Sequence, residues 1–462
     1  MMSERIPEDR NLDSAAPDLS DVITNGMCVA CGACEAVDPQ INLHLDTEKQ
    51  MYLPDNAGTS EAASVCPAIH VEYPELHRLL FPQANVTEHG VVESVFLAQS
   101  SDKQRNLRAS SGGIIKELMR AYLAEPEVDG VICLGPGNGL EFEPIIVRAL
   151  DQIDDLPGSI YHNVPLGGSL RLLRENEGRF VLTAIPCQLE GIYTYIFKHA
   201  PELRQRIHAT IGLVCGWNYS HHALRAICEY KGIDYEAIED ISYRGNGPVG
   251  KLRITAHGKT TEIDRRLDLS YQVAFDRTFN IPRCHLCVNH PNFLADVVVG
   301  DAWLPSTVRT RTGVSLVICR TSESEKLLEE LVEKSVATLV TGGLDDITES
   351  QGRSLTFGDF SYGYADYLEE KGQFTPKMRG PNREAAQIAS QSAIAKIALA
   401  FRHKQNMQSQ RRYRAIWWRK LTIELGSLLY RYASWFFTRI LKARSLTGQR
   451  KEISAKRMAV FK

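Results

Sequence analysis

The stretch GRFVLTAIPCQLEGIYTYI, residues 178–196, decides the fold, because it runs from a mostly apolar segment through Pro186 into a longer segment. Residues 180–184 have the length and character of a buried strand. Pro186 suits the first turn of a helix, where a missing N–H costs nothing. We therefore predict a buried strand that runs directly into a helix, with Cys187 at the start of that helix.

The same strand-and-helix alternation continues on both sides of this stretch. Residues 208–220 predict a second strand that ends in a cysteine, and residues 105–125 predict a loop feeding an amphipathic helix. Further strands are predicted at 91–100, 129–135 and 143–150. The glycine-rich GPGNG, residues 135–139, precedes a strand, whereas a dinucleotide-binding loop opens a helix, so we predict a hairpin turn there. The fold class is therefore α/β (mixed α+β), with a mostly parallel or mixed sheet from about residue 90 to 320.

Composition places the chain among soluble proteins with metal or redox chemistry. It has 462 residues, of which 44% are hydrophobic and 24% charged, and this length suits two or three domains. The first 21 residues are polar and acidic and do not resemble a signal peptide, which predicts a cytoplasmic protein. Eleven cysteines in a cytoplasmic chain indicate metal or redox sites more than disulfides.

The stretch CVACGACEAVDPQ, residues 28–40, begins like a bacterial iron-sulfur ferredoxin but has Asp38 where the fourth cysteine of that run would stand. In such a run the fourth cysteine binds a second cluster, so the local cluster still needs a remote fourth thiolate. The next cysteine, Cys66, is followed by a proline, as expected for that ligand. Residues 41–55 are predicted to be an inserted hairpin. The predicted ligands of this 4Fe-4S site are Cys28, Cys31, Cys34 and Cys66.

Zinc is the alternative metal for these four cysteines, because four thiolates also suit a tetrahedral zinc ion. Zinc sites usually contain two CxxC pairs, whereas this stretch reads C-x2-C-x2-C, and the difference favours the iron-sulfur cluster. A zinc-stapled scaffold protein stays an alternative to a redox protein.

Four further cysteines could be gathered by the fold: Cys187, Cys215, Cys284 and Cys287. The first two follow predicted strands and would lie at the carboxyl edge of the sheet, where α/β folds bind ligands. Three interpretations stay open, namely a second 4Fe-4S cluster, a catalytic thiol at Cys187 activated by the helix dipole, and ordinary buried cysteines. Ordinary burial is predicted for Cys133, Cys228 and Cys319. The histidines at 221, 222, 285 and 290 lack metal-ligand spacing and are expected to be ordinary polar residues.

The stretch RASSGG, residues 108–113, is a candidate anion-binding loop. Ser110 and Ser111 can cap the following helix, and Gly112 with Gly113 would let backbone amides approach an anion closely. Arg108 adds a positive charge beside the loop. A phosphate-bearing cofactor such as FAD suits this loop, and a bare helix cap has the same residues.

The carboxy-terminal part is basic and predicted to be helical. From Phe401 onward there are sixteen Lys and Arg against two Glu, although the net charge of the chain is −3. Residues 421–443 read as an amphipathic helix, and because Arg431 and Arg439 leave no uncharged run of 18 residues, a spanning helix is not expected. Peripheral contact with the inner face of a membrane is one prediction, and packing against the body or another subunit is the other.

Together these motifs resemble the coenzyme F420 hydrogenase/dehydrogenase beta-subunit family. The landmarks, which follow one another in the family's order over roughly residues 24–350, are RASSGG, IPCQLEGI, IGLVCG, ISYRGNGPVGKL and CHLCVNHPNFLADVVVGDAW. The resemblance implies a flavin- and cluster-containing oxidoreductase that passes electrons between FAD and a partner through 4Fe-4S centres. It also implies that Arg108 and residues 110–113 contact the flavin, that the second group of cysteines binds a cluster, and that Gly300 and Asp301 shape the site. Ser159, Ile160 and Tyr161 stand where the family often has Ser-Lys-Tyr, and Ala184 with Ile185 where it has Gly-Thr.

The resemblance and the motifs lead to four predicted segments: a flexible lead (1–22), a ferredoxin-like 4Fe-4S module (23–85), a central α/β domain binding FAD and iron-sulfur (86–382) and a basic helical tail (383–462). The predicted function is electron transfer between a low-potential donor, of ferredoxin or deazaflavin type, and a small-molecule substrate. The alternative is a non-catalytic electron-transfer subunit of a larger complex, of the kind linked to polysaccharide synthesis. A redox protein is the expected macromolecular partner, and a nucleic acid is not.

Overall fold

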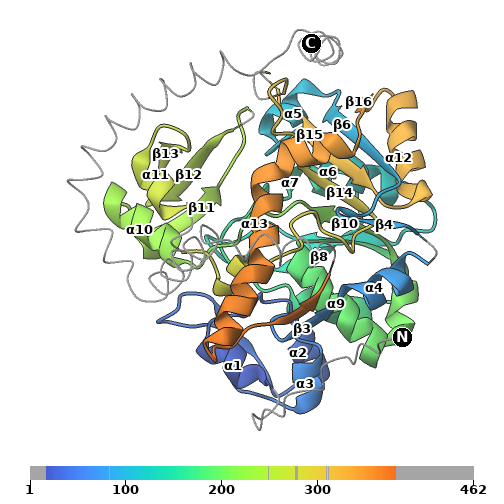
Figure 1. The fold of residues 1–462 in the computed structure, drawn as a ribbon. Helices are drawn as coiled ribbons and strands as arrows, with labels where there is room; N and C mark the ends of the chain where they lie inside the picture. Colours follow the sequence, from blue (N-terminus) through green and yellow to red (C-terminus); the bar gives the residue numbers. More distant parts are fainter. Residues whose placement is uncertain are drawn as a thin grey trace, which may run out of the picture.

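The protein is described by a computed structural model that covers residues 17–380, apart from residues 83, 248, 276–278, 308–309 and 311 (Figure 1). The predicted tail at 383–462, including its membrane contact, and the first sixteen residues of the predicted lead lie outside the described residues. Within the described part, no helix combines the length and apolar character needed to cross a bilayer.

An eight-stranded mixed sheet forms the centre of the molecule, in the strand order β16-β6-β15-β14-β10-β9-β7-β8. Four adjacent strands, β14, β10, β9 and β7, run parallel to one another, and antiparallel pairings extend the sheet on both sides. Parallel strands are covered on both faces, which explains their apolar sequences. The predicted mixed α/β sheet is confirmed. Its strands are β6 (Ser94–Ser100), β7 (Gly130–Leu134), β8 (Pro144–Val147), β9 (Phe180–Ala184), β10 (Ile207–Leu213), β14 (Val297–Asp301), β15 (Ser315–Cys319) and β16 (Ala337–Thr341).

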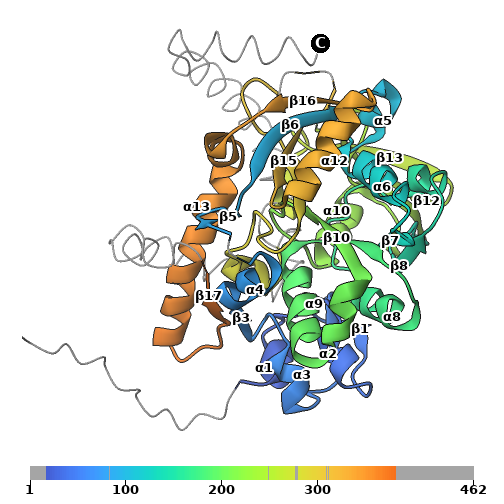
Figure 2. The same cartoon turned by 90° about the vertical axis from the view of Figure 1, so that its right-hand side faces the viewer.

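Helices cover both faces of this sheet (Figure 2). Val181 of β9 packs in one core cluster with α6 (Ile114–Leu123) and α12 (Ser322–Glu333). Its neighbour Leu182 packs in the other core cluster, with α8 (Gly167–Glu175) and α9 (Pro186–His199). Successive side chains of a strand point to opposite faces, so one short strand serves both cores. The strand and helix predicted from residues 178–196 are confirmed as β9 and α9.

Short elements of residues 19–80 pack against α9 and share its core. The antiparallel pairing of β1 with β2 confirms the hairpin predicted within residues 41–55. Asp18 caps α1, so a helix begins inside the predicted flexible lead. The description of this part as a ferredoxin-like module stays a prediction. Its elements are α1 (Leu19–Thr24), α2 (Ala33–Val37), β1 (Leu43–Leu45), β2 (Tyr52–Pro54), α3 (Ser60–Ser64), β3 (His70–Glu72) and α4 (Tyr73–Leu80).

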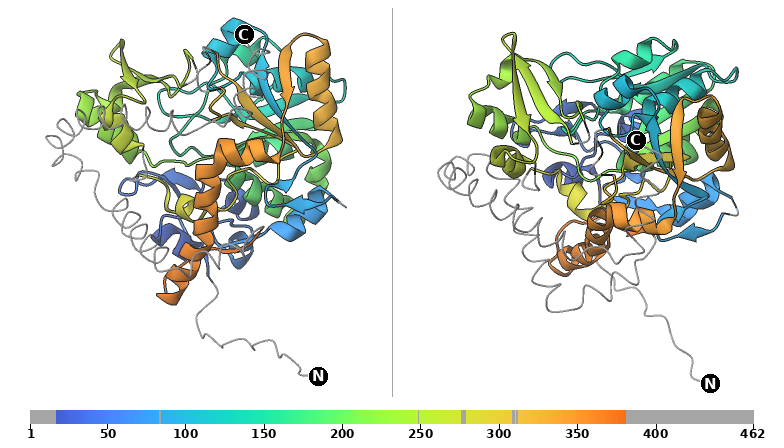
Figure 3. Two further views of the ribbon diagram at one scale, coloured as in Figure 1. Left: turned by 45° about the horizontal axis from the view of Figure 1, so that its top comes forward. Right: turned by 90° about the horizontal axis from the view of Figure 1, so that it is seen from above.

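A three-stranded antiparallel sheet with two helices forms a separate unit, which lies beside the main sheet on the side away from α12 (Figure 3). This unit has its own core, in which Tyr243 and Phe275 are buried. Its elements are α10 (His222–Lys231), β11 (Ile238–Ser242), β12 (Lys251–Ala256), β13 (Lys259–Asp264) and α11 (Leu269–Ala274).

The remaining elements connect these parts. The antiparallel pairing of β7 with β8 confirms the hairpin predicted at GPGNG. Residues 105–108 belong to a helix, where a loop was predicted, because the Asp102 side chain caps it by accepting hydrogen bonds from two backbone amides. Late in the chain, β17 returns to pair in parallel with β3. These elements are β4 (Val86–Thr87), β5 (Gly90–Val91), α5 (Lys103–Arg108), α7 (Gln152–Asp155), α13 (Leu344–Glu370), β17 (Lys377–Arg379) and the 3-10 helices η1 (Pro201–Arg206), η2 (Tyr235–Ala237) and η3 (Pro282–Leu286).

Candidate metal centres

The structure brings together the first group of cysteines, Cys28, Cys31, Cys34 and Cys66. All four are buried, and each thiol lies near enough to another of the group to raise its pKa. The loop before α2 turns tightly, because Ala30 and Gly32 have positive φ angles of 55° and 74°. The Ala30 amide donates a hydrogen bond to the Cys28 sulfur at 3.3 Å. Such amide-to-sulfur bonds are typical of the surroundings of cluster ligands.

The structure also brings together the second group, Cys187, Cys215, Cys284 and Cys287, which come from three separate parts of the sequence. The other three thiols all contribute to raising the pKa of Cys187. Cys187 lies in the first turn of α9, and Cys215 lies two residues after the end of β10. The Asn218 amide donates a hydrogen bond to the sulfur of Cys284 at 3.4 Å. The carboxyl edge of the parallel strands therefore gathers these cysteines, as the sequence predicted.

Burial keeps these thiols protonated at neutral pH. It raises the pKa of Cys31, Cys66 and Cys287 to about 12 and the pKa of Cys284 to about 11, because an uncompensated thiolate is poorly solvated inside the protein. Thiolate ligands at these positions therefore require the positive charge of a metal, whose binding releases the protons. Burial, with the nearby carboxyl of Glu190, also raises the pKa of Cys187, which is the opposite of what an activated catalytic thiol needs.

The spacing of the sulfurs favours a cluster over a single zinc ion. In the part of the chain that the structure describes, one set of three possible ligand atoms lies within 4.8 Å of one another, that of Glu125, Glu127 and His208. This set contains no cysteine. A tetrahedral zinc ion with Zn–S bonds of about 2.3 Å would hold its four sulfurs roughly 3.8 Å apart. Neither group of cysteines is that compact, whereas a cubane of several iron and sulfide atoms spreads its ligands further apart.

Helix α9 contacts both groups. Cys187 in its first turn belongs to the second group, and four residues later Gly191 faces the first. A Cβ atom at Gly191 would lie 2.5 Å from the Cys31 sulfur, so this glycine is required by close packing. Four residues of an α-helix span about 6 Å, so α9 brings the two groups within about one helical turn of each other.

The segment after Cys287 fixes the second group against the sheet. His290 donates a hydrogen bond from its Nδ1 to the Cys215 carbonyl at 2.6 Å, and the Cys215 amide donates to the His290 carbonyl at 3.0 Å. Asn292 donates to the carbonyl of Ala184 at 3.1 Å, at the end of β9. His290 was predicted to be an ordinary polar residue, but it positions the backbone of a cysteine.

The buried side chain of Arg320 fixes the backbone of this segment by hydrogen bonds. Its guanidinium donates to the backbone carbonyls of Pro291 at 2.8 Å and Asn292 at 3.1 Å, and also to those of His89 and Val91. Burial lowers its pKa to about 9. Nothing in the sequence distinguished this arginine, because its partners are backbone groups distant along the chain.

The loop at residues 108–113 is fixed by the main sheet. The Gly112 amide donates to Ser315 Oγ at 2.9 Å, and a Cβ atom at Gly112 would lie 2.4 Å from the Ala98 carbonyl oxygen. The absence of a side chain at Gly112 therefore makes room for the sheet, and not for a ligand as the sequence suggested. Ser110 accepts a hydrogen bond from the Ser159 amide at 3.1 Å and Ser111 donates to the Val314 carbonyl at 3.0 Å, so neither serine caps the helix. Gly113 is the N-cap of α6, without a side-chain cap.

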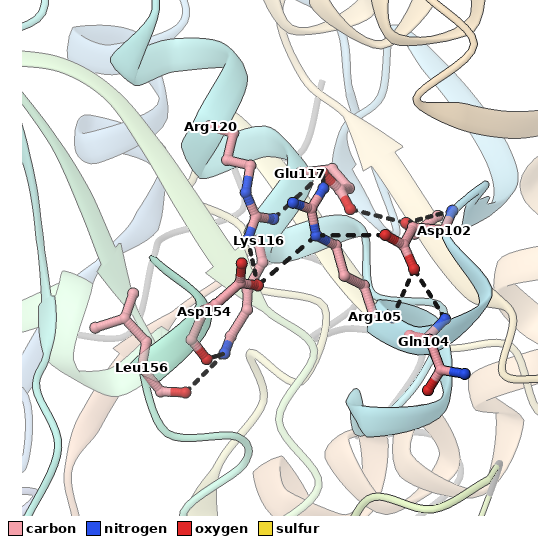
Figure 4. Close-up of polar contacts among 9 residues, drawn as sticks. Asp102, Gln104, Arg105, Lys116, Glu117, Arg120, Asp154 and Leu156 are labelled. Atoms are coloured by element: carbon pink, nitrogen blue, oxygen red, sulfur yellow. Dashed lines mark hydrogen bonds and ion pairs between the residues drawn. The ribbon is translucent and has the colours of Figure 1, made fainter. Parts of the chain in front are cut away.

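An ion-pair network anchors the helices on both sides of this loop (Figure 4). The buried carboxylate of Glu117 on α6 lies 3.6 Å from Arg105 on α5 and 3.3 Å from Arg120. Arg120 also pairs with Asp154 at 2.5 Å, and Ser100 donates to Glu117 at 2.7 Å. These contacts join α5, α6 and α7, so the loop between α5 and α6 is held at both ends.

Two further loops meet the loop at 108–113. The amides of Asn246 and Gly247 donate to the Leu107 carbonyl, and Gly158 lies against Ser110. Arg244, next to Gly245, pairs with Asp301 at 2.5 Å and lies 5.7 Å from the ring of Trp303, which is 40% exposed. The predicted Gly300 and Asp301 thus lie at this junction.

Comparison with known families identifies the chain. The family described as coenzyme F420 hydrogenase/dehydrogenase, beta subunit, matches through its N-terminal part at residues 95–171 and its C-terminal part at residues 178–342. Together these matches take in more than half of the chain and include the loop at 108–113 and the second group of cysteines.

Individual relatives are distant. The coenzyme F420 hydrogenase subunit beta of Methanothermobacter thermautotrophicus is 26% identical over 258 residues, which cover 54% of this chain and 84% of the relative. A component of the F(420)H(2) dehydrogenase of Methanosarcina mazei is 22% identical over 324 residues, or 64% of this chain and 83% of the relative. A chain in a solved structure of the F420-reducing NiFe hydrogenase complex from Methanosarcina barkeri has a TM-score of 0.48 and 20% identity, over 63% of this chain and 97% of that chain. On the strength of the two family matches, this chain belongs to the coenzyme F420 hydrogenase/dehydrogenase beta-subunit family.

Proposed function

We propose that the protein is an iron-sulfur flavoprotein oxidoreductase that passes electrons through two 4Fe-4S clusters and FAD. The observation that carries this proposal is that α9 contacts two groups of four cysteines, one at Cys187 and the other one helical turn later at Gly191. Membership of the family supports an oxidoreductase role, because the relatives named above are components of a hydrogenase and of a dehydrogenase.

The two groups of cysteines are the proposed cluster ligands. Each group offers the four thiolates that a cubane cluster needs, and these buried thiols need a bound cation to ionise. The short path along α9 lets electrons pass from one cluster site to the other without crossing solvent. The buried surroundings also exclude water, which protects reduced iron-sulfur centres.

The junction of loops at 108–113, 157–159 and 244–247 is the proposed FAD site. The first amides of α6 lack a side-chain cap, and a helix start of this kind favours a phosphate. The exposed Arg108 adds a positive charge, and Trp303 offers an exposed ring at the same junction. When bound, FAD supplies the exchange between two-electron substrate chemistry and one-electron cluster chemistry.

The proposed donor is a low-potential carrier, either a ferredoxin or a deazaflavin such as coenzyme F420. The names of the relatives include this coenzyme. The proposed acceptor is a small molecule whose identity we leave open. Ile160 stands where the family often has a lysine for contact with cofactor or substrate, so of these two donors the deazaflavin is the less favoured.

A second candidate is a non-catalytic electron-transfer subunit of a larger complex. The two relatives named first are each one part of a multi-component enzyme, which favours a protein partner for this chain. The two candidates differ in whether the isolated protein reduces a small molecule in the steady state.

The exposed Arg108 gives a direct test of the FAD site. Arg108→Gln is expected to weaken FAD binding roughly fivefold, because it removes one exposed positive charge next to the proposed phosphate site without disturbing the core. Fluorescence titration of the full-length protein with FAD measures this change. Lys103→Gln, at the exposed other end of α5, is the matched control and should leave the affinity unchanged.

Equal weakening by both variants would mean that only the general charge of the surface matters. A wild-type protein that neither contains nor binds flavin would remove the flavoenzyme and leave the electron-transfer subunit as the better account.

A further inference from the structure

A buried ion pair lies between the two groups of cysteines. Arg283 and Glu190 are 1% and 0% exposed, and the guanidinium Nη2 lies 3.3 Å from the carboxylate Oε2. Glu190 is on α9, one residue before the glycine that touches Cys31, and Arg283 directly precedes Cys284. A pair of charges is costly to bury, so its position calls for a role beyond filling space.

Arg283 joins the loops that carry both groups. Its Nε donates to the carbonyl of Pro67 at 3.2 Å, immediately after Cys66 of the first group. Its Nη1 donates to the carbonyl of Leu286 at 3.1 Å, immediately before Cys287 of the second. One planar guanidinium thereby fixes two backbone segments that are more than 200 residues apart in the sequence.

Other buried groups hold Glu190 in place. Its Oε1 accepts hydrogen bonds from the Tyr73 hydroxyl at 2.6 Å and from Asn289 Nδ2 at 2.9 Å. Tyr73 and Asn289 are both fully buried. Because every polar atom of the carboxylate has a partner, the pair has one fixed geometry between the two groups.

The charges of this pair act on thiols of both groups. The Arg283 guanidinium contacts the carbonyls next to Cys66 and Cys287, so its positive charge lies close to both groups. The Glu190 carboxylate lies on the same helix as Cys187, three residues further on, so its negative charge lies close to the second group. A charge that favours a thiolate also favours the more negative, reduced form of a cluster bound to that thiolate.

We propose that Arg283, held by Glu190, is a positioning residue shared by both cluster sites, whose fixed positive charge raises the reduction potentials of the two clusters together. This inference rests on the proposed function, because it requires a cluster at each group of cysteines. It adds a physical link between the sites: a change at one buried pair alters both redox centres. Reduction of one cluster adds negative charge beside the same guanidinium, which makes reduction of the second less favourable.

The test is a redox titration of full-length, anaerobically purified protein, in which paramagnetic resonance follows each cluster. Arg283→Met keeps the length of the side chain and removes the charge, and it is expected to shift both reduction equilibria at least tenfold toward the oxidised form, or about 59 mV per electron. Glu190→Gln keeps most of the hydrogen bonds and removes the negative charge, so both equilibria should shift in the opposite direction. Arg283→Lys keeps the charge and should recover most of the wild-type potentials.

The matched control is Arg206→Met, which removes an arginine that binds the backbone carbonyls of Leu173, Arg174 and Asn176. It should leave both potentials unchanged. If Arg283→Met loses its iron, the Glu190→Gln and Arg283→Lys titrations still decide the question. Shifts in one cluster alone, shifts of the same sign for Arg283→Met and Glu190→Gln, or no shift in either would overturn the inference. A wild-type protein without two clusters would instead overturn the proposed function.

Discussion

Gly191→Ala is expected to abolish the first cluster and to leave the second in place, so that the protein loses about half of its iron. The added methyl group would lie 2.5 Å from the Cys31 sulfur and 3.1 Å from its Cβ atom. Non-bonded atoms prefer roughly 3.5 to 4.0 Å, so Cys31 must move by about 1 Å. A displacement of this size exceeds the roughly 0.5 Å within which metal-site geometry must be held. Iron assay and paramagnetic resonance of the anaerobically purified variant measure the loss.

The substitution tests the contact with Cys31 specifically, because it does not weaken the helix. Alanine is a better helix former than glycine by about 1 kcal/mol, so α9 itself should be no less stable. Gly352→Ala on α13 is the matched control, since a Cβ atom there meets nothing within 4 Å. Full iron in Gly191→Ala would mean that α9 does not pack against the first cluster as described. Loss of iron from the control would point to a general effect of the substitution.

Single cysteine substitutions should separate the two sites. Cys66→Ala is expected to remove the signal of the first cluster and Cys287→Ala that of the second, each with a loss of about four iron atoms. A buried site cannot recruit a replacement ligand from water, so the losses should be close to complete. The fully buried Cys228 belongs to neither group, and Cys228→Ala is the control.

The assignment of cysteines to the two groups would be wrong if Cys66→Ala and Cys287→Ala removed the same signal. Unchanged iron in Cys66→Ala would exclude Cys66 from the first site, and the first cluster would then need a different fourth ligand.

The sequence predicted those features that depend on local pattern. The strand and helix around Pro186 followed from a buried apolar run and from the tolerance of proline in the first turn of a helix. Cys215 was placed beside Cys187 because both follow strands, and parallel strands end at one edge of a sheet. The hairpin within residues 41–55 followed from its alternating pattern.

Long-range packing escaped prediction. Gly112 was interpreted as a ligand-binding glycine, because the pattern SSGG before a helix fits both a loop that contacts a phosphate and a loop that packs against a strand. In the structure that neighbour is the Ala98 carbonyl of β6. Likewise Gly191 reads as an unfavourable residue inside a helix, and only the fold reveals that it makes room for Cys31.

The pairing of Arg283 with Glu190 was also beyond sequence reasoning. The two residues are 93 positions apart, and their neighbours, Leu189 and Gly191 for the one and Pro282 and Cys284 for the other, suggest nothing about a buried charge. Buried charges are rare unless paired, and only the fold reveals the partner. Residue spacing therefore located the candidate ligands, whereas the contacts between the two sites required the structure.

The central claim is that each group of four cysteines holds a 4Fe-4S cluster. Assay of iron, acid-labile sulfide and zinc in the anaerobically purified full-length protein, with paramagnetic resonance after reduction, tests it most directly. We predict about eight iron and about eight sulfide atoms per chain, with two interacting signals. About two zinc ions per chain without iron, or no more than about four iron atoms in fully loaded protein, would contradict it.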